Sequence, residues 1–127
     1  MIFDRKQYLD SLVSSQGNGL VKIVTGGRRC GKSFLLFNLF RNYLLENGVE
    51  EDHIIGVALD ERESRFLRDP DTLLDYITKR TVKDSKPHYI ILDEIQLVDN
   101  FVEVLLSLMH KPHLDVYVSG SNSRFLS

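Results

Sequence analysis

The residue types with the clearest chemistry lie in one short run near the start of the chain. The run is Gly26-Gly27-Arg28-Arg29-Cys30-Gly31-Lys32-Ser33. It matches the pattern G-x-x-x-x-G-K-[ST] of a loop whose backbone N–H groups surround a phosphate. Gly26 and Gly31 allow backbone conformations that a side chain would disfavour. Lys32 would bring a positive charge to the β- and γ-phosphates of a nucleotide, and Ser33 would offer its hydroxyl to Mg²⁺.

The residues on either side of this run support the interpretation. Residues 20–25 are mostly apolar and β-branched, which is typical of a buried strand, and residues 34–45 form an apolar stretch that is too long for a strand and is followed by Asn47-Gly48. A strand, a loop and a helix in this order are what a phosphate-binding loop requires, whereas a glycine-rich surface turn would not need them. We expect the whole run and the following Phe34 to contact the nucleotide.

A second group of chemically active residues follows the apolar stretch 88–92. Asp93 comes directly after that stretch and Glu94 comes next. An Asp at the end of a buried strand could hold Mg²⁺ together with Ser33, so we predict Ser33 and Asp93 as the metal ligands. We assign Glu94 to orienting or deprotonating the attacking water. Lys32 and Mg²⁺ would supply part of the stabilisation of the charge that develops during hydrolysis. The alternative for Glu94 is a solvent-facing residue that ends the strand.

The third group is the run 119–123, which follows the last apolar strand. Ser121 or Asn122 could bond the γ-phosphate or the attacking water, or could form only local turn bonds. Five arginines are candidates for the residue that stabilises the developing charge: Arg28, Arg29, Arg62, Arg65 and Arg124. None is convincing, so we expect another part of the protein or another subunit to supply it. Cys30 is interpreted as a small loop residue rather than a redox switch.

The alternation of apolar strands and helices along the chain predicts that these groups lie on an α/β fold. Apolar strands are predicted at 20–25, 53–60, 88–94 and 114–118, and helices at 4–15, from Lys32 onward, from Asp69-Pro70 and at 100–110. Continuous apolar strands separated by helices predict a parallel sheet covered on both faces. The helix at 4–15 is a packing helix or a lid over the adenine. For the helix at 100–110, Asp99 is the predicted cap. Its predicted inward residues are Val102, Leu105, Leu106 and Met109.

Composition sets broad limits on the class of protein. The chain has 127 residues, 43% hydrophobic and 27% charged, with a net charge of -2. These values are ordinary for a globular domain and give no general basic character for nucleic-acid binding. No apolar run reaches the length of a membrane span, and one cysteine makes no internal disulfide, so we expect a cytoplasmic protein. The four histidines have no metal-ligand spacing and receive no role.

With these motifs in view, the chain resembles the N-terminal ATPase region of bacterial and archaeal AAA-type ATPases that carry a nuclease-like C-terminal domain of unknown function. The resemblance rests on three runs: residues 25–33, Leu92-Asp93-Glu94-Ile95-Gln96, and residues 119–127. It implies a P-loop NTPase, a three-layer α/β/α sandwich with a mostly parallel sheet of strand order 5-1-4-3-2 and a catalytic glutamate. Residues 1–127 would hold strands one to four, truncated before the fifth strand and the helical lid, with the C-terminal remainder absent.

The predicted function is ATP binding and Mg²⁺-dependent hydrolysis, with ATP or ADP as ligand and self-association or a protein partner supplying the arginine. The main alternative is a nucleotide-gated switch or scaffold with slow hydrolysis, for which the resemblance suggests an association with DNA. A GTPase is disfavoured because no Asn is followed by Lys, as guanine recognition would require. A small-molecule kinase is also disfavoured, because the Asp93-Glu94 pair fits that class of enzyme less well.

Overall fold

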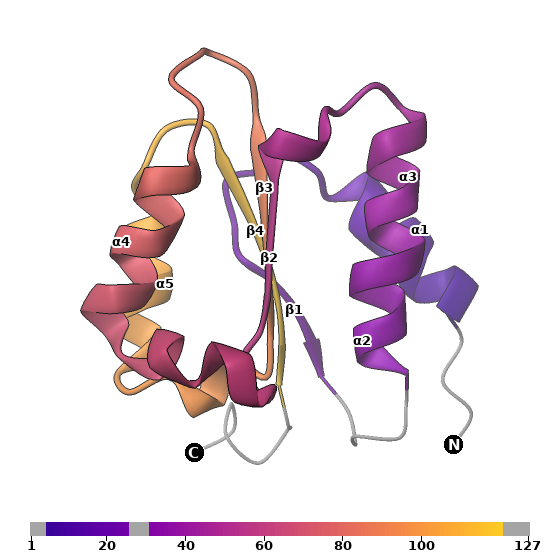
Figure 1. The fold of residues 1–127 in the computed structure, drawn as a ribbon. Coiled ribbons are helices and arrows are strands. Elements are labelled where there is room, and N and C mark those ends of the chain that lie inside the picture. The colour runs from indigo at the N-terminus through magenta and orange to yellow at the C-terminus, as the bar shows by residue number, and fades with distance from the viewer. Residues whose placement is uncertain (1–4, 26–30, 121–127) are drawn as a thin grey trace.

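The computed structural model describes residues 5–25 and 31–120. Four strands form one parallel sheet: β1 (Lys22–Thr25), β2 (Ile54–Ala58), β3 (His88–Asp93) and β4 (Leu114–Gly120). Helices α1 (Arg5–Ser14), α2 (Lys32–Phe34) and α3 (Arg41–Glu46) lie on one face, and α4 (Pro70–Arg80) and α5 (Phe101–Met109) lie on the other (Figure 1). This confirms the predicted three-layer α/β architecture. Within the described residues, no helix has the length and apolarity needed to cross a membrane.

The strand order within the sheet is β1-β4-β3-β2. It agrees with the 1-4-3-2 part of the order implied by the resemblance. In register, Leu92 of β3 pairs with Val118 of β4, and Thr25 of β1 pairs with Gly120. The carboxyl ends of β1, β3 and β4 therefore lie together at one edge of the sheet. Ligands of open α/β sheets bind at such edges.

The helical segment after the predicted phosphate loop is continuous from Lys32 to Glu46. Its middle part, Leu35–Phe40, is a π-helix that joins α2 to α3. Leu35, Leu36, Phe40 and Leu44 are fully buried between the sheet and α1. The helical segment is thus buried on one side against the sheet and α1, whereas Ser33, Phe34 and Asn38 are exposed. Leu12 of α1 belongs to the same core, which favours the packing role for α1.

The opposite face is covered by α4 and α5. Asp69 caps α4 as predicted, because its Oδ2 accepts a hydrogen bond from the Thr72 N–H at 3.0 Å, and Pro70 is the first helical residue. Leu73 and Ile77 of α4 are fully buried. Most of the charged run at 61–65 lies in a 3-10 helix, Arg62–Arg68, whose Leu67 enters the core.

The prediction for α5 was partly wrong. Its N-cap is Asn100 rather than Asp99, and no side-chain hydrogen bond caps the helix. The buried residues are Val104, Leu105 and Leu108, while the other three predicted inward residues, Val102, Leu106 and Met109, are exposed. The helix is apolar on two adjacent faces, so its periodicity fits either one. Contact with the sheet selects the face that includes Val104 and Leu108.

This choice of face can be tested with one substitution made on each face of α5. Leu108→Ala should lower the free energy of unfolding by about 2–5 kcal/mol, because Leu108 is fully buried and its loss leaves a cavity. Leu106→Ala, the matched control, should change it by about 0.5 kcal/mol or less, because Leu106 is 47% exposed. Urea unfolding measures both values. Equal costs for the two substitutions would show that the assigned face is wrong.

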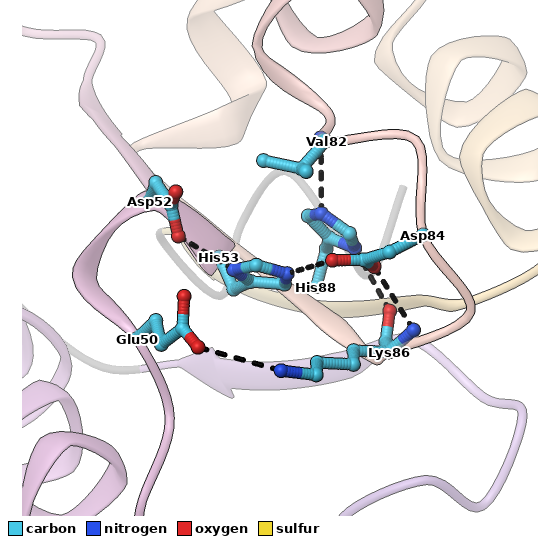
Figure 2. A network of polar contacts seen from close by, with 7 residues as sticks. All are labelled: Glu50, Asp52, His53, Val82, Asp84, Lys86 and His88. Carbon is cyan, nitrogen blue, oxygen red and sulfur yellow. Dashed lines mark hydrogen bonds and ion pairs between the residues drawn. The ribbon is translucent and has the colours of Figure 1, made fainter.

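Two histidines that the sequence left without a role form a polar network at the amino ends of β2 and β3 (Figure 2). The buried His53 ring has Nδ1 2.6 Å from Asp52 Oδ1 and Nε2 2.7 Å from Asp84 Oδ2. Ionised carboxylates only accept hydrogen bonds, so both contacts can form at once only when the ring is protonated. His88 stacks on this ring at 4.3 Å. Its Nε2 accepts from the Val82 N–H and its Nδ1 donates to the Lys86 carbonyl.

The network gives stability a pH dependence with a defined sign. The hydrogen bond to Asp84 is the main cause that raises the pKa of His53 above 6.5, against the opposing effect of burial, and Asp52 adds to it. The same bond lowers the pKa of Asp84. The His53 contribution is therefore complete below its unfolded-state pKa and is lost as pH rises through the higher folded-state pKa. The Asp84 contribution is lost at the other end, as pH falls through its lowered pKa.

We therefore expect the free energy of unfolding to fall as pH rises from 6.5 through the raised folded-state pKa of His53, with Asp84→Asn reducing the slope because it removes the main cause of the shift. Asp10→Asn, an exposed residue of α1, is the control and should leave the slope unchanged. Urea unfolding across this pH range measures the slopes. Parallel curves for wild type and Asp84→Asn would contradict the assignment.

Candidate functional site

The predicted chemical groups meet at the carboxyl edge of the sheet. Thr25 ends β1, Asp93 ends β3 and Gly120 ends β4. The helical segment that begins at Lys32 starts at the same edge (Figure 1). Gly31, directly before it, has a left-handed backbone with φ of 81°, which suits glycine. Five predicted loop contacts lie outside the described residues: Gly26, Gly27, Arg28, Arg29 and Cys30.

Ser33 and Asp93 form the first pair in the site. The Ser33 hydroxyl donates a hydrogen bond to Asp93 Oδ2 at 2.6 Å, although 60 residues separate them in the chain. Asp93 is 2% exposed, so its carboxylate lies in the interior rather than in bulk water. The two predicted metal ligands are thus adjacent. Their hydroxyl and carboxylate oxygens are the hard donors that Mg²⁺ prefers, so the donor set fits that ion.

Lys32 and Glu94 form the second pair. Lys32 is 2% exposed, and its Nζ lies 3.5 Å from Glu94 Oε2. The same Nζ donates a hydrogen bond to the Gly120 carbonyl at 3.0 Å. A buried ammonium is costly unless it has such partners. Lys32 is therefore held at the carboxyl ends of β3 and β4 by groups that carry negative charge or a carbonyl dipole.

The backbone at Glu94 explains how two adjacent carboxylates serve one site. Side chains on a strand alternate, so Asp93 and Glu94 would point to opposite faces if the strand continued. The strand ends at Asp93, and Glu94 has a left-handed backbone with φ of 59°. Its side chain turns toward Lys32 and is 8% exposed. The alternative of a solvent-facing Glu94 is therefore wrong.

Two residues of the site were missed by the sequence analysis. Ser119 of β4 donates a hydrogen bond from its hydroxyl to Asp93 Oδ1 and accepts one from the Glu94 N–H at 3.0 Å. Gln96 donates from its Nε2 to Glu94 Oε1 at 2.7 Å. Ser119 could have been found from the register, because Val118 pairs with Leu92 and places the next residues side by side. No sequence signal marks Gln96 beyond its place in the run 92–96.

Burial dominates the electrostatics of Asp93. Loss of solvent raises the pKa of its carboxyl group, and the hydrogen bonds from Ser119 and Ser33 offset part of that effect. The nearby Glu94 carboxylate acts in the same direction as burial. Negative charge at this position is therefore costly until a cation compensates it, and a bound divalent cation would favour the ionised form.

Ser121, Asn122 and Arg124 lie outside the described residues. Phe34 follows Ser33 in α2 and is 44% exposed. Arg62 and Arg65 lie exposed on the 3-10 helix after β2. The described residues thus bring together Lys32, Ser33, Asp93 and Glu94.

Comparison with known proteins identifies the family of this chain. Residues 18–127 match an AAA domain. The chain belongs to the AAA domain family. The match covers all four strands and the helical segment that starts at Lys32, so the residues of the site all fall within this AAA domain.

Two relatives of this AAA domain carry no functional name. An uncharacterized protein of Haemophilus influenzae is 27% identical over 126 residues, which cover 99% of this chain and 31% of that protein. An uncharacterized protein of Methanocaldococcus jannaschii is 25% identical over 111 residues, which cover 84% of this chain and 22% of that protein. The AAA domain therefore spans about a third or less of these relatives. No solved structure matches the chain.

Proposed function

We propose that this AAA domain binds ATP and hydrolyses it in a Mg²⁺-dependent reaction. One observation carries the proposal. The lysine and serine that end the predicted phosphate loop contact the two carboxylates at the carboxyl end of β3, through the Lys32–Glu94 and Ser33–Asp93 pairs. A glycine-rich surface turn would give no reason for a buried lysine and two buried carboxylates to meet there.

The chain's own residues divide the work of the reaction. Lys32 and the N–H groups of the loop would hold the phosphates, with the amino end of the following helical segment favouring their negative charge. Lys32 would then exchange its contact with Glu94 for one with the β- and γ-phosphates. Glu94, released from that contact, would accept a proton from the water that attacks the γ-phosphorus. The bond from that phosphorus to the bridging oxygen breaks, leaving ADP and inorganic phosphate.

Ser33 and Asp93 would hold Mg²⁺. The ion, when bound, would neutralise charge on the phosphate oxygens. Ser119 fixes Asp93 from the side of β4, so the carboxylate is oriented before any ligand binds. Ser121 or Asn122 stays the predicted contact to the γ-phosphate or the attacking water.

The wider function rests on parts of the protein beyond this domain. We expect the charge-stabilising arginine to come from another subunit or from a protein partner, and a nuclease-like domain to follow in the chain, as the resemblance implies. A cytoplasmic location also stays a prediction. In the alternative function the domain is a nucleotide-gated switch or scaffold, with DNA as a candidate partner, and it would bind nucleotide but hydrolyse it rarely without its partner.

The test is thermal unfolding of the chain with Mg·ADP, Mg·ATP and Mg·GTP. Mg·ADP at about 100 times its Kd should stabilise the fold by about 2.7 kcal/mol, which raises Tm by several degrees. A similar rise with Mg·ATP but not with Mg·GTP would support adenine specificity. No rise with any nucleotide at millimolar concentration would contradict the proposal for this domain.

A further inference from the structure

Gln96 makes one polar side-chain contact that ties it to the proposed reaction. Its Nε2 donates a hydrogen bond to Glu94 Oε1 at 2.7 Å. Its own Oε1 is buried and is the one such side-chain atom that lacks a hydrogen-bond partner among the residues the structure describes. An amide whose acceptor has no partner is oriented by its donor bond. The Gln96 side chain is therefore oriented by Glu94.

The two oxygens of Glu94 have different partners. Oε2 faces Lys32 at 3.5 Å, and Oε1 receives the Gln96 hydrogen bond. In the proposed function Lys32 turns to the phosphates, so its contact with Oε2 is lost when nucleotide binds. Nucleotide binding does not require Gln96 to change partner, so its hydrogen bond to Glu94 Oε1 can persist. It would then be the side-chain contact that fixes the carboxylate while Oε2 faces the attacking water.

The local backbone makes this contact rigid. Glu94 has the uncommon left-handed conformation, and its N–H is held by Ser119 Oγ. The Leu97 N–H then bonds the Glu94 carbonyl at 3.1 Å, which closes a tight turn around Ile95 and Gln96. Ile95 is fully buried and anchors this turn in the core. Left-handed residues of this kind cluster at functional sites, where the surrounding structure holds them.

We propose that Gln96 is a positioning residue for the Glu94 carboxylate, holding Oε1 so that Oε2 is presented to the attacking water once Lys32 has moved to the phosphates. This inference rests on the proposed ATP hydrolysis and adds a residue to it. Gln96 touches Glu94 rather than the nucleotide. Its removal should therefore affect turnover and leave nucleotide binding nearly unchanged.

The test compares Gln96→Leu with wild type in steady-state ATP hydrolysis by the full-length protein. We expect kcat to fall about 10- to 100-fold, because a misplaced catalytic group costs rate at this scale. KM for ATP and the Tm rise with Mg·ADP should stay within about twofold of wild type. Gln16→Leu is the matched control. Its amide bonds the Tyr89 hydroxyl, and Tyr89 lies near the amino end of β3, so turnover should not change.

A double-mutant cycle separates positioning from a general structural role. In a Glu94→Gln background the carboxylate is absent, so adding Gln96→Leu should lower the residual rate no further. Independent, multiplying effects of the two substitutions would overturn the inference, and so would an unchanged kcat in Gln96→Leu. A wild-type protein that binds no nucleotide and has no turnover would overturn the proposed function itself, and the inference with it. When the wild-type protein hydrolyses ATP, the kinetics of the Gln96→Leu variants therefore test only the positioning role of Gln96.

Discussion

Replacing Glu94 with glutamine should lower kcat for ATP hydrolysis by about 10²- to 10⁴-fold, which is the usual contribution of a general base. Glutamine keeps nearly the same shape and can still bond its neighbours, but it cannot accept the proton of the attacking water. Glu94 is 6% exposed and its side chain lies against Lys32, so the carboxylate is already inside the site. Turnover of Mg·ATP by the full-length protein measures the effect.

Nucleotide binding should survive this substitution. The phosphates would be held by Lys32 and the loop, and removing the charge of Glu94 leaves Lys32 free to bind them. Mg·ATP should therefore raise Tm at least as much in Glu94→Gln as in wild type. Glu103→Gln, an exposed residue of α5, is the control and should hydrolyse ATP normally. Unchanged kcat in Glu94→Gln would remove Glu94 from the mechanism and favour a different base.

The second large effect concerns binding. Lys32→Met should abolish the Tm rise with Mg·ADP, a loss of about 2.7 kcal/mol of ligand stabilisation at 100 times the wild-type Kd. The physical reason is that Lys32 is the buried cation of the described site, and methionine keeps its length but not its charge. Hydrolysis should fall with binding. The measurement is thermal unfolding with and without Mg·ADP, with urea unfolding to compare the nucleotide-free proteins.

The control for Lys32→Met is Lys79→Met. Lys79 is exposed on α4 and pairs with Asp75 at 2.9 Å, a surface ion pair that contributes about 0.5 kcal/mol or less. The Tm rise of this variant with Mg·ADP should equal that of wild type. A normal rise in Lys32→Met would mean that the nucleotide binds without the buried lysine, and the phosphate site would have to lie elsewhere.

Much of the site could be predicted because its parts are local in sequence. The spacing of Gly31, Lys32 and Ser33 sets a turn and a helix start within a few residues, and Asp93 follows its own apolar strand directly. Such signals depend on neighbouring residues along the chain. The parallel sheet could be predicted for the same reason, since the strands are mainly apolar and helices separate them in the sequence.

Contacts between distant segments needed the tertiary structure. Ser119 meets Asp93 because the register of β4 against β3 brings together residues that lie 26 positions apart. His53 meets Asp84 because the amino ends of β2 and β3 are adjacent in the sheet. Spacing along the chain does not show how close such residues lie in space, which is why the sequence assigned no role to His53 and His88.

The sequence by itself determined the phosphate-loop pattern, the order of strands and helices, and the residue types that could hold a phosphate and a metal. The tertiary structure decided which face of α5 is buried, that Glu94 turns into the site rather than toward solvent, and that Gln96 binds it. The periodicity of α5 allowed either of two faces, and packing against the sheet stabilises one of them. At Glu94 the left-handed backbone and the contacts with Ser119 and Lys32 turn the side chain into the site.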